Sequence, residues 1–100
     1  MAVVEFKNEN GVLEYYVNDI SSYDGFDNLI EFFTSIELGR LSEELEGPGT
    51  RLALIEFGKA KIQLVFNDQV GNYFYAADDL GLIKAKELAV AIGKRIEENN

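Results

Sequence analysis

The stretch "RLALIEFGKAKIQLVF", residues 51–66, decides the fold of this chain. Two apolar segments flank Gly58-Lys59, and a Gly-X pair between two such segments is typical of a two-residue type II′ hairpin turn. A two-residue loop here sets Ile55 opposite Ile62, so that apolar side chains share one face of the pair. The stretch therefore predicts two adjacent antiparallel strands.

The same register makes the hairpin apolar on its second face as well. It pairs Ala53 with Leu64 and sets Glu56 opposite Lys61, which are complementary charges. The apolar residues of the second face are Leu52, Leu54 and Val65. Strands that are apolar on both faces are typical of the centre of a sheet. We therefore predict that these two strands are central and covered on both sides.

The stretch "EGPGTR", residues 46–51, leads into this hairpin. Pro48 in the second position and Gly49 in the third fit a type II turn. A phosphate-binding loop would need a lysine at a fixed offset and a helix after the loop, whereas Arg51 opens a predicted strand. We therefore interpret this stretch as a turn.

Residues 38–46, which precede this turn, fit two structures. Leu38, Leu41 and Leu45 have helical spacing, with Gly47 as a stop signal. The alternative is an edge strand that turns back through the Gly-Pro-Gly segment. The spacing favours a helix slightly, and the choice stays open.

Beyond the central hairpin, "NDQVGNYFYA", residues 67–76, predicts a turn followed by a short aromatic strand. A last helix is predicted from Asp78 or Asp79, which would cap it, to about Glu98. Its apolar stripe consists of Leu82, Ala85, Leu88, Ala89, Ile92 and Ile96.

At the other end of the chain, residues 2–8 and 12–18 flank Asn10-Gly11, a strong signal for a two-residue type I′ hairpin. That loop sets Phe6 opposite Tyr15. The other pairs are Val4 with Val17 and, on the opposite face, Lys7 with Glu14. Tyr16 then falls on the polar face, where we expect it at the surface.

The segment "DISSYDGFDNLIEFFTSI", residues 19–36, predicts a loop followed by a helix that Asp24 or Asp27 caps. The apolar stripe of this helix is Phe26, Leu29, Ile30, Phe33 and Ile36. The predicted order is therefore ββα(α/β)βββα. This is one α+β domain, residues 1–100, with an antiparallel sheet of about five strands and helices packed mainly on one face.

The net charge of −9 is distributed unevenly. Residues 1–46 hold eleven acidic and two basic side chains, whereas residues 47–100 hold seven of each. Such a field disfavours nucleic acid and anionic lipid, which are bound by Lys and Arg, and it attracts a basic protein. Because residues 1–20 lack the pattern of a secretory signal and no apolar run is long enough to span a membrane, we expect a cytoplasmic protein without a membrane partner.

The composition also argues against catalysis, because the chain has neither histidine nor cysteine. The acidic loop that starts at Asp19 does not fit a calcium-binding EF-hand, whose fifth and sixth positions would fall on Tyr23 and Asp24. We therefore expect no enzymatic activity, no cofactor and no metal site.

A protein-binding surface is the remaining interpretation. Acidic residues that lack interspersed bases form a patch for a partner, and exposed tyrosines are enriched at the centres of protein interfaces. The candidate partner-binding residues are Asp19, Asp24, Asp27, Glu31, Glu37, Glu43, Glu44, Glu46, Tyr16 and Tyr23.

The layout resembles that of small bacterial immunity proteins, the partners of contact-dependent growth inhibition and related polymorphic toxins. The resemblance covers the whole chain in layout, and at the level of residues it lies in 46–51 and 67–76. It implies an inhibitor that binds a cognate toxin domain, often a basic nuclease, and blocks its active site. The alternative is a small adaptor or structural domain that forms a homodimer through an exposed edge strand.

Overall fold

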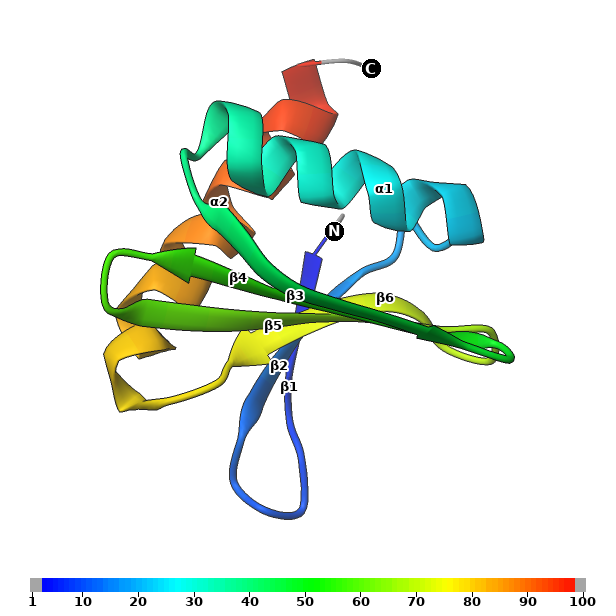
Figure 1. The fold of residues 1–100 in the computed structure, drawn as a ribbon, viewed down its shortest axis with the longest axis horizontal. Coiled ribbons are helices and arrows are strands. Elements are labelled where there is room, and N and C mark those ends of the chain that lie inside the picture. Colours follow the sequence, from blue (N-terminus) through cyan, green and yellow to red (C-terminus); the bar gives the residue numbers. More distant parts are fainter. Residues whose placement is uncertain (1–2, 99–100) are drawn as a thin grey trace.

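The computed structural model describes residues 3–98, which form an α+β fold with a six-stranded antiparallel sheet (Figure 1). The strands lie in the order β1-β2-β6-β5-β4-β3. Their bounds are β1 (Val3–Lys7), β2 (Leu13–Val17), β3 (Arg40–Gly47), β4 (Thr50–Phe57), β5 (Ala60–Asn67) and β6 (Gly71–Ala76). The helical segments are α1 (Tyr23–Glu31), the π-helix η1 (Phe32–Ile36), the 3-10 helix η2 (Asp79–Gly81) and α2 (Leu82–Glu98).

The predicted pairing of the central strands β4 and β5 is confirmed. Ile55 lies opposite Ile62 and Glu56 opposite Lys61, as the two-residue loop requires. Gly58 has a φ of 64°, and Lys59 is not among the described residues with positive φ, so the turn has the type II′ pattern.

The core lies on one face of the sheet. The side chains that the helices contribute to it include Phe26, Leu29, Phe33, Ala85, Leu88 and Ile92. They pack against buried residues of the strands such as Ile55, Leu64 and Phe74. On the opposite face Val65 is buried, but Leu52 and Leu54 are only half-buried. The prediction that β4 and β5 are covered on both sides is therefore wrong for the second face.

Residues 40–47 form the edge strand β3, so the slight preference for a helix over residues 38–46 was wrong. The helical segment ends at Ile36, and Leu38, two residues later, has a φ of 64°. The backbone at Gly39 then packs so close to the side chains of Ile55 and Phe57 that a side chain at position 39 would clash with them. Gly49, with a φ of 68°, fits the predicted type II turn into β4. Because β3 is a strand, the sheet has six strands rather than about five.

The register predicted for the first hairpin is wrong by one residue. The loop has three residues rather than two, because the amide of Gly11 donates to the carbonyl of Asn8 and the amide of Asn8 to that of Val12. The Asn8 side chain also accepts hydrogen bonds from the backbone. Gly11 has a φ of 82°, as the third residue of such a loop requires.

This shift changes which side chains lie opposite one another in β1 and β2. Glu5 lies opposite Tyr15, and Phe6 lies opposite Glu14. Since a shift of one residue exchanges the two faces of a strand, Val4 and Phe6 point to the uncovered face of the sheet.

The helix ends follow local capping chemistry. The Ser22 hydroxyl caps α1 by accepting from the amide of Gly25, so Asp24 and Asp27 are not the caps. The carboxylate of Asp78 accepts from the amide of Gly81 at the start of η2, which confirms the predicted cap. Ile36 and Leu82, both predicted in apolar stripes, are exposed. No helix within residues 3–98 is long and apolar enough to cross a membrane.

The close packing of Gly39 against Ile55 and Phe57 gives a test of this topology. In a Gly39→Ala variant the new Cβ would lie 2.6 Å from the Phe57 ring and 2.7 Å from the Ile55 side chain. We expect the free energy of unfolding to fall by about 1–3 kcal/mol, which is the usual cost of overpacking. Gly47→Ala, whose Cβ would meet no atom within 4 Å, is the control and should change stability little. Equal stability of the two variants in urea denaturation would contradict this close packing at Gly39.

Candidate functional site

The candidate site is built around Arg51, the one charged residue that is buried within residues 3–98. Its guanidinium makes a bidentate ion pair with Asp27, at 2.7 Å from Nη2 to Oδ1 and 3.1 Å from Nη1 to Oδ2. Nη1 also donates to the backbone carbonyl of Tyr23, and Nη2 lies 3.3 Å from Oε2 of Glu44. This network therefore connects α1, β3 and β4. It also gives Arg51 the charged partners that a buried cation needs to be tolerated.

Two aromatic rings enclose the same guanidinium. The Cζ atom of Arg51 lies 4.6 Å from the ring centroid of Tyr23 and 4.6 Å from that of Phe26. Phe26 is fully buried, whereas the Tyr23 side chain remains 45% exposed. The stacking fixes Tyr23 at the surface with one ring face against a cation.

The ion pair changes the titration of both partners. The hydrogen bonds from Arg51 hold the pKa of Asp27 below its ordinary value of 3.8. In turn, the hydrogen bonds to Asp27 raise the pKa of Arg51 above its ordinary value. Both groups are therefore charged at neutral pH.

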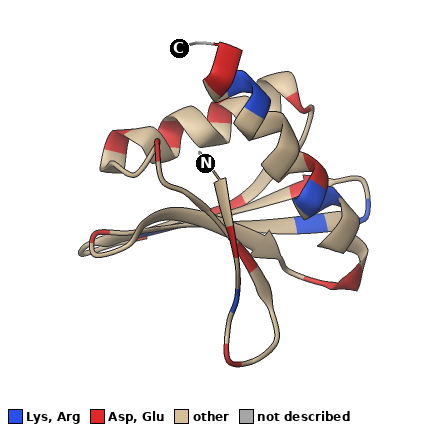
Figure 2. Cartoon of the chain, turned by 180° about the vertical axis from the view of Figure 1, so that it is seen from behind, with Lys and Arg blue, Asp and Glu red and all other residues tan. Residues whose placement is uncertain are grey.

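Further carboxylates flank this network and form what we call the acidic face. Its members are Asp24, Asp27 and Glu31 on α1 and Glu44 and Glu46 on β3. All five are exposed, and Glu46 lies opposite Arg51 in the β3–β4 register. Figure 2 shows acidic segments along α1 and both basic and acidic segments along α2. Because five carboxylates outnumber the one guanidinium, the acidic face carries a net negative charge.

The structure does not bring the other predicted residues to this face. Glu37 lies next to α2, with its Oε1 atom 3.9 Å from Nζ of Lys84. Asp19 lies beside a groove between β1 and α2. Glu43 and Tyr16 lie on the uncovered face of the sheet. The predicted set is therefore divided among four places. Tyr23, Asp27, Glu44 and Glu46 interact with Arg51, and Asp24 and Glu31 lie elsewhere on α1.

The uncovered face of the sheet carries a row of aromatic rings. Tyr16 stacks on Tyr73 with centroids 4.7 Å apart, and Tyr73 lies 6.4 Å from Tyr75. Phe6 meets Tyr16 edge-on at 6.4 Å. Burial, followed by the hydrogen bond to Glu14, raises the pKa of Tyr16 to about 12. Sequence reasoning missed the place of Phe6 because the hairpin register was wrong.

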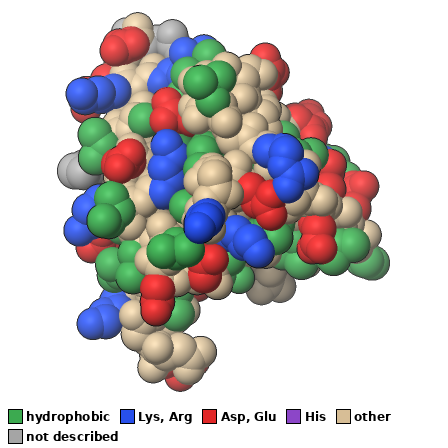
Figure 3. Space-filling view, turned by 60° about the vertical axis from the view of Figure 1, so that its left-hand side comes forward, with side chains coloured by type: hydrophobic (Ala, Val, Ile, Leu, Met, Phe, Trp, Pro, Cys, Tyr) green, Lys and Arg blue, Asp and Glu red, His purple; other side chains and the backbone are tan. Residues whose placement is uncertain are grey.

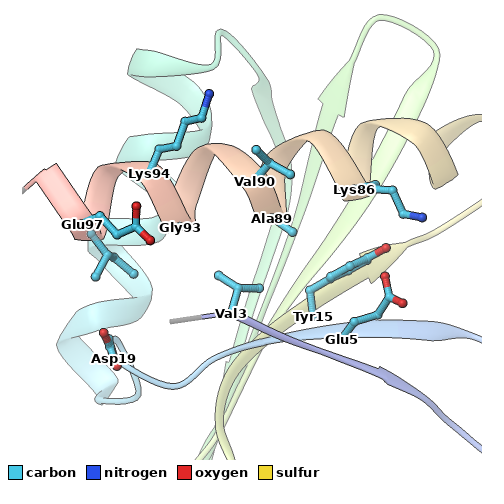
Figure 4. Close-up of a pocket in the computed structure, with 11 residues that line it drawn as sticks. Val3, Glu5, Tyr15, Asp19, Lys86, Ala89, Val90, Gly93, Lys94 and Glu97 are labelled. Carbon is cyan, nitrogen blue, oxygen red and sulfur yellow. The ribbon is translucent and has the colours of Figure 1, made fainter. Parts of the chain in front are cut away.

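The groove between β1 and α2 has a volume of about 640 Å³ (Figure 4). Its lining includes Val3, Glu5 and Tyr15 from the sheet and Ala89 and Gly93 from α2. Burial and the neighbouring Glu5 carboxylate raise the pKa of the Tyr15 hydroxyl to about 12. No pattern in the sequence predicts this groove, because its two walls lie at opposite ends of the chain.

Basic side chains are distributed differently from the acids. Seven of the nine Lys and Arg residues lie in the second half of the chain, and α2 carries four of them. On the face that Figure 3 shows, basic, acidic and apolar side chains are intermixed. The acidic face therefore has no basic counterpart of similar purity on that side of the molecule.

Comparison of this chain with protein-family models, curated proteins and solved structures gives no match. Within residues 3–98 no three acidic side chains are arranged to hold a metal ion. The interpretation of the site therefore rests on its own geometry.

The Arg51–Asp27 pair predicts a specific pH dependence of stability. In Asp27→Asn, buried Arg51 loses its charged partner, and we expect the free energy of unfolding at pH 7 to fall by about 1–2 kcal/mol. Because the pKa of Asp27 is lowered on folding, its contribution is present above the ordinary value of 3.8 and is lost as the pH falls through the lower folded-state value.

Thermal unfolding as a function of pH measures this difference. The wild type and Asp27→Asn should differ at neutral pH and converge in acid. The control Glu87→Gln, at an exposed position on α2, should follow the wild type throughout. A constant gap between wild type and Asp27→Asn down to strongly acidic pH would show that the ion pair is not its cause.

Proposed function

We propose that this chain binds and neutralises a basic protein partner, in the manner of an immunity protein or antitoxin whose partner is a toxin domain. The observation that carries this proposal is the acidic face, where exposed carboxylates surround a cation that is itself buried. A basic nuclease is the partner class that this chemistry fits best, because its substrate groove must attract phosphate groups.

The electrostatics of the acidic face favour rapid association. Asp24, Glu31 and Glu46 are exposed, and none of them forms a salt bridge within the described residues. Their negative potential would steer a basic surface toward α1 and β3 and raise the association rate at low salt. The same potential repels nucleic acid, so the chain would compete with the substrate of a nuclease without binding that substrate.

The Arg51 network would make this face rigid before a partner arrives. It holds Asp27 and Glu44 in place and fixes the ring of Tyr23. A side chain that is already ordered loses little conformational entropy on binding. Exposed Tyr23, surrounded by carboxylates, is therefore the expected anchor of the interface.

The polypeptide encoded immediately upstream of this chain is the partner to test. We expect a protein with a basic C-terminal domain that copurifies with this chain when the two are coexpressed. Association would then be followed by stopped-flow fluorescence over a range of salt concentrations. The triple variant Asp24→Asn, Glu31→Gln, Glu46→Gln should associate roughly tenfold more slowly at low salt and show a flatter salt dependence.

A second triple variant keeps the same change in net charge away from the acidic face. It carries Glu9→Gln, Glu87→Gln and Glu98→Gln, all at exposed positions. Its association rate should stay close to that of the wild type. If both triple variants slow association equally, net charge rather than the acidic face is responsible, and the proposed site is wrong.

A further inference from the structure

The outer edge of β1 has free backbone groups. Antiparallel ladders alternate between hydrogen-bonded and non-hydrogen-bonded pairs. Asn8 and Val12 form a hydrogen-bonded pair at the hairpin end, so counting back along β1 places Phe6 and Val4 in the same class. The amides and carbonyls of residues 3, 5 and 7 therefore point away from β2. Within residues 3–98 no strand pairs with them.

The opposite edge of the sheet is protected against strand pairing. β3 carries Glu43, Glu44 and Glu46, and a bulge at Ser42 interrupts its register. Charge and bulges are the usual means by which an edge strand avoids pairing with another chain. β1 has a regular register and one residue of each charge, Glu5 and Lys7, so it is the edge that is open to another strand.

The groove beside β1 provides room for a strand. Along it, α2 runs opposite to β1, from Lys86 near Glu5 to Glu97 near Val3 (Figure 4). This part of α2 is about 16 Å long, which equals the length of a five-residue strand. Gly93 lines the groove, and a side chain there would meet no atom within 4 Å. Glycine within a helix costs about 1 kcal/mol relative to alanine. A glycine at a position where an alanine side chain would fit therefore indicates room for another segment to bind against α2.

We propose that the occupant is the β1 strand of a second copy of this chain, paired antiparallel about a two-fold axis at Glu5. This register uses the whole strand, since Val3 lies opposite Lys7 of the second copy and Glu5 lies opposite its counterpart. All three outward-pointing residues then form hydrogen-bonded pairs, and the two sheets join into one.

The charges of the groove fit this register. It brings Lys7 of the second copy to the Val3 end, where Asp19 and Glu97 line the groove (Figure 4). Lys94 extends away from β1 in the same view. The two Glu5 side chains meet at the axis, and like charges opposite each other are unfavourable. Lys86, which lines the groove at the Glu5 end, would offset this repulsion from both copies.

Apolar side chains fit the register on both faces. On the uncovered face it pairs Val4 with Phe6 of the second copy, and these residues are 42% and 54% exposed in the single chain. On the helical face, Val90 lines the groove and is continuous with exposed Ile83 along α2. Pairing would remove these exposed apolar groups from water.

This dimer goes beyond the proposed function and is compatible with it. The acidic face lies at β3, and β1 is at the other end of the sheet. A dimer through β1 would therefore leave both acidic faces free to bind partners.

Sedimentation equilibrium of the purified chain, from micromolar to millimolar concentration, tests the proposal. We expect a reversible monomer–dimer equilibrium, with a mass that rises from 11.2 kDa toward twice that value. In Glu5→Pro the amide lost points outward, so the β1–β2 ladder is retained while two intermolecular hydrogen bonds disappear. The dissociation constant should rise roughly tenfold or more.

Glu5→Thr is the matched control, because it keeps the amide and removes the repulsion at the axis. It should strengthen the dimer by roughly threefold. The double variant Asp19→Asn, Glu97→Gln leaves the backbone of β1 unchanged and should weaken the dimer. Circular dichroism verifies that each variant is folded.

Three results would overturn the proposal. The first is a monomeric wild type over the whole concentration range. The second is a dimer that Glu5→Pro leaves unchanged, which would place self-association on another surface. The third is a dimer that Glu5→Thr weakens as much as Glu5→Pro does, which would mean that Glu5 does not lie opposite its counterpart.

Discussion

The structure depends on one ion pair, between the buried Arg51 of β4 and the exposed Asp27 of α1. A cation with an 8% exposed side chain must be paired to be tolerated, so the position of α1 over the sheet is fixed by the need to satisfy Arg51. Buried Asn72 supports the same placement, since its amide donates to the backbone carbonyls of Ile20 and Ser22 just before the helix. Both contacts fix the helix by polar geometry, which is directional, rather than by apolar burial, which is not.

The same ion pair determines the character of the surface above it. Arg51 neutralises part of the field of its neighbours, but five carboxylates against one cation leave a net negative charge. The guanidinium, buried under Tyr23, also orders two of these carboxylates, Asp27 and Glu44. The stability of the fold and the proposed recognition of a basic partner thus depend on one group.

The sequence predicted correctly those parts of the fold for which local interactions allow a single loop length and a single strand register. Gly58-Lys59 admits a two-residue loop, and both charge and apolar pairing agree with the register that follows. Asn10-Gly11 predicted a hairpin correctly but its register wrongly, because the Asn8 side chain favours a longer loop. The strand at residues 40–47 was the less favoured of two alternatives, because the helical spacing of its leucines was overridden by pairing with β4, which is a tertiary interaction. Of the candidate site, the acids and Tyr23 were predictable from composition, but their convergence on Arg51 was not, since the ion pair joins residues 24 positions apart.

The two edges of the sheet differ in a way that follows from charge. At β3 the carboxylates prevent another strand from approaching, and the same carboxylates attract basic side chains. At β1 the charges are few and balanced, so backbone pairing is electrostatically permitted. A sheet whose ends both resembled β3 would not pair with a second copy, and one whose ends both resembled β1 would pair at each end and form open-ended assemblies. The concentration of carboxylates on β3 rather than on β1 is therefore more than a means of solubility, because under the two proposals it would give each edge a different kind of partner and limit strand pairing to one of them.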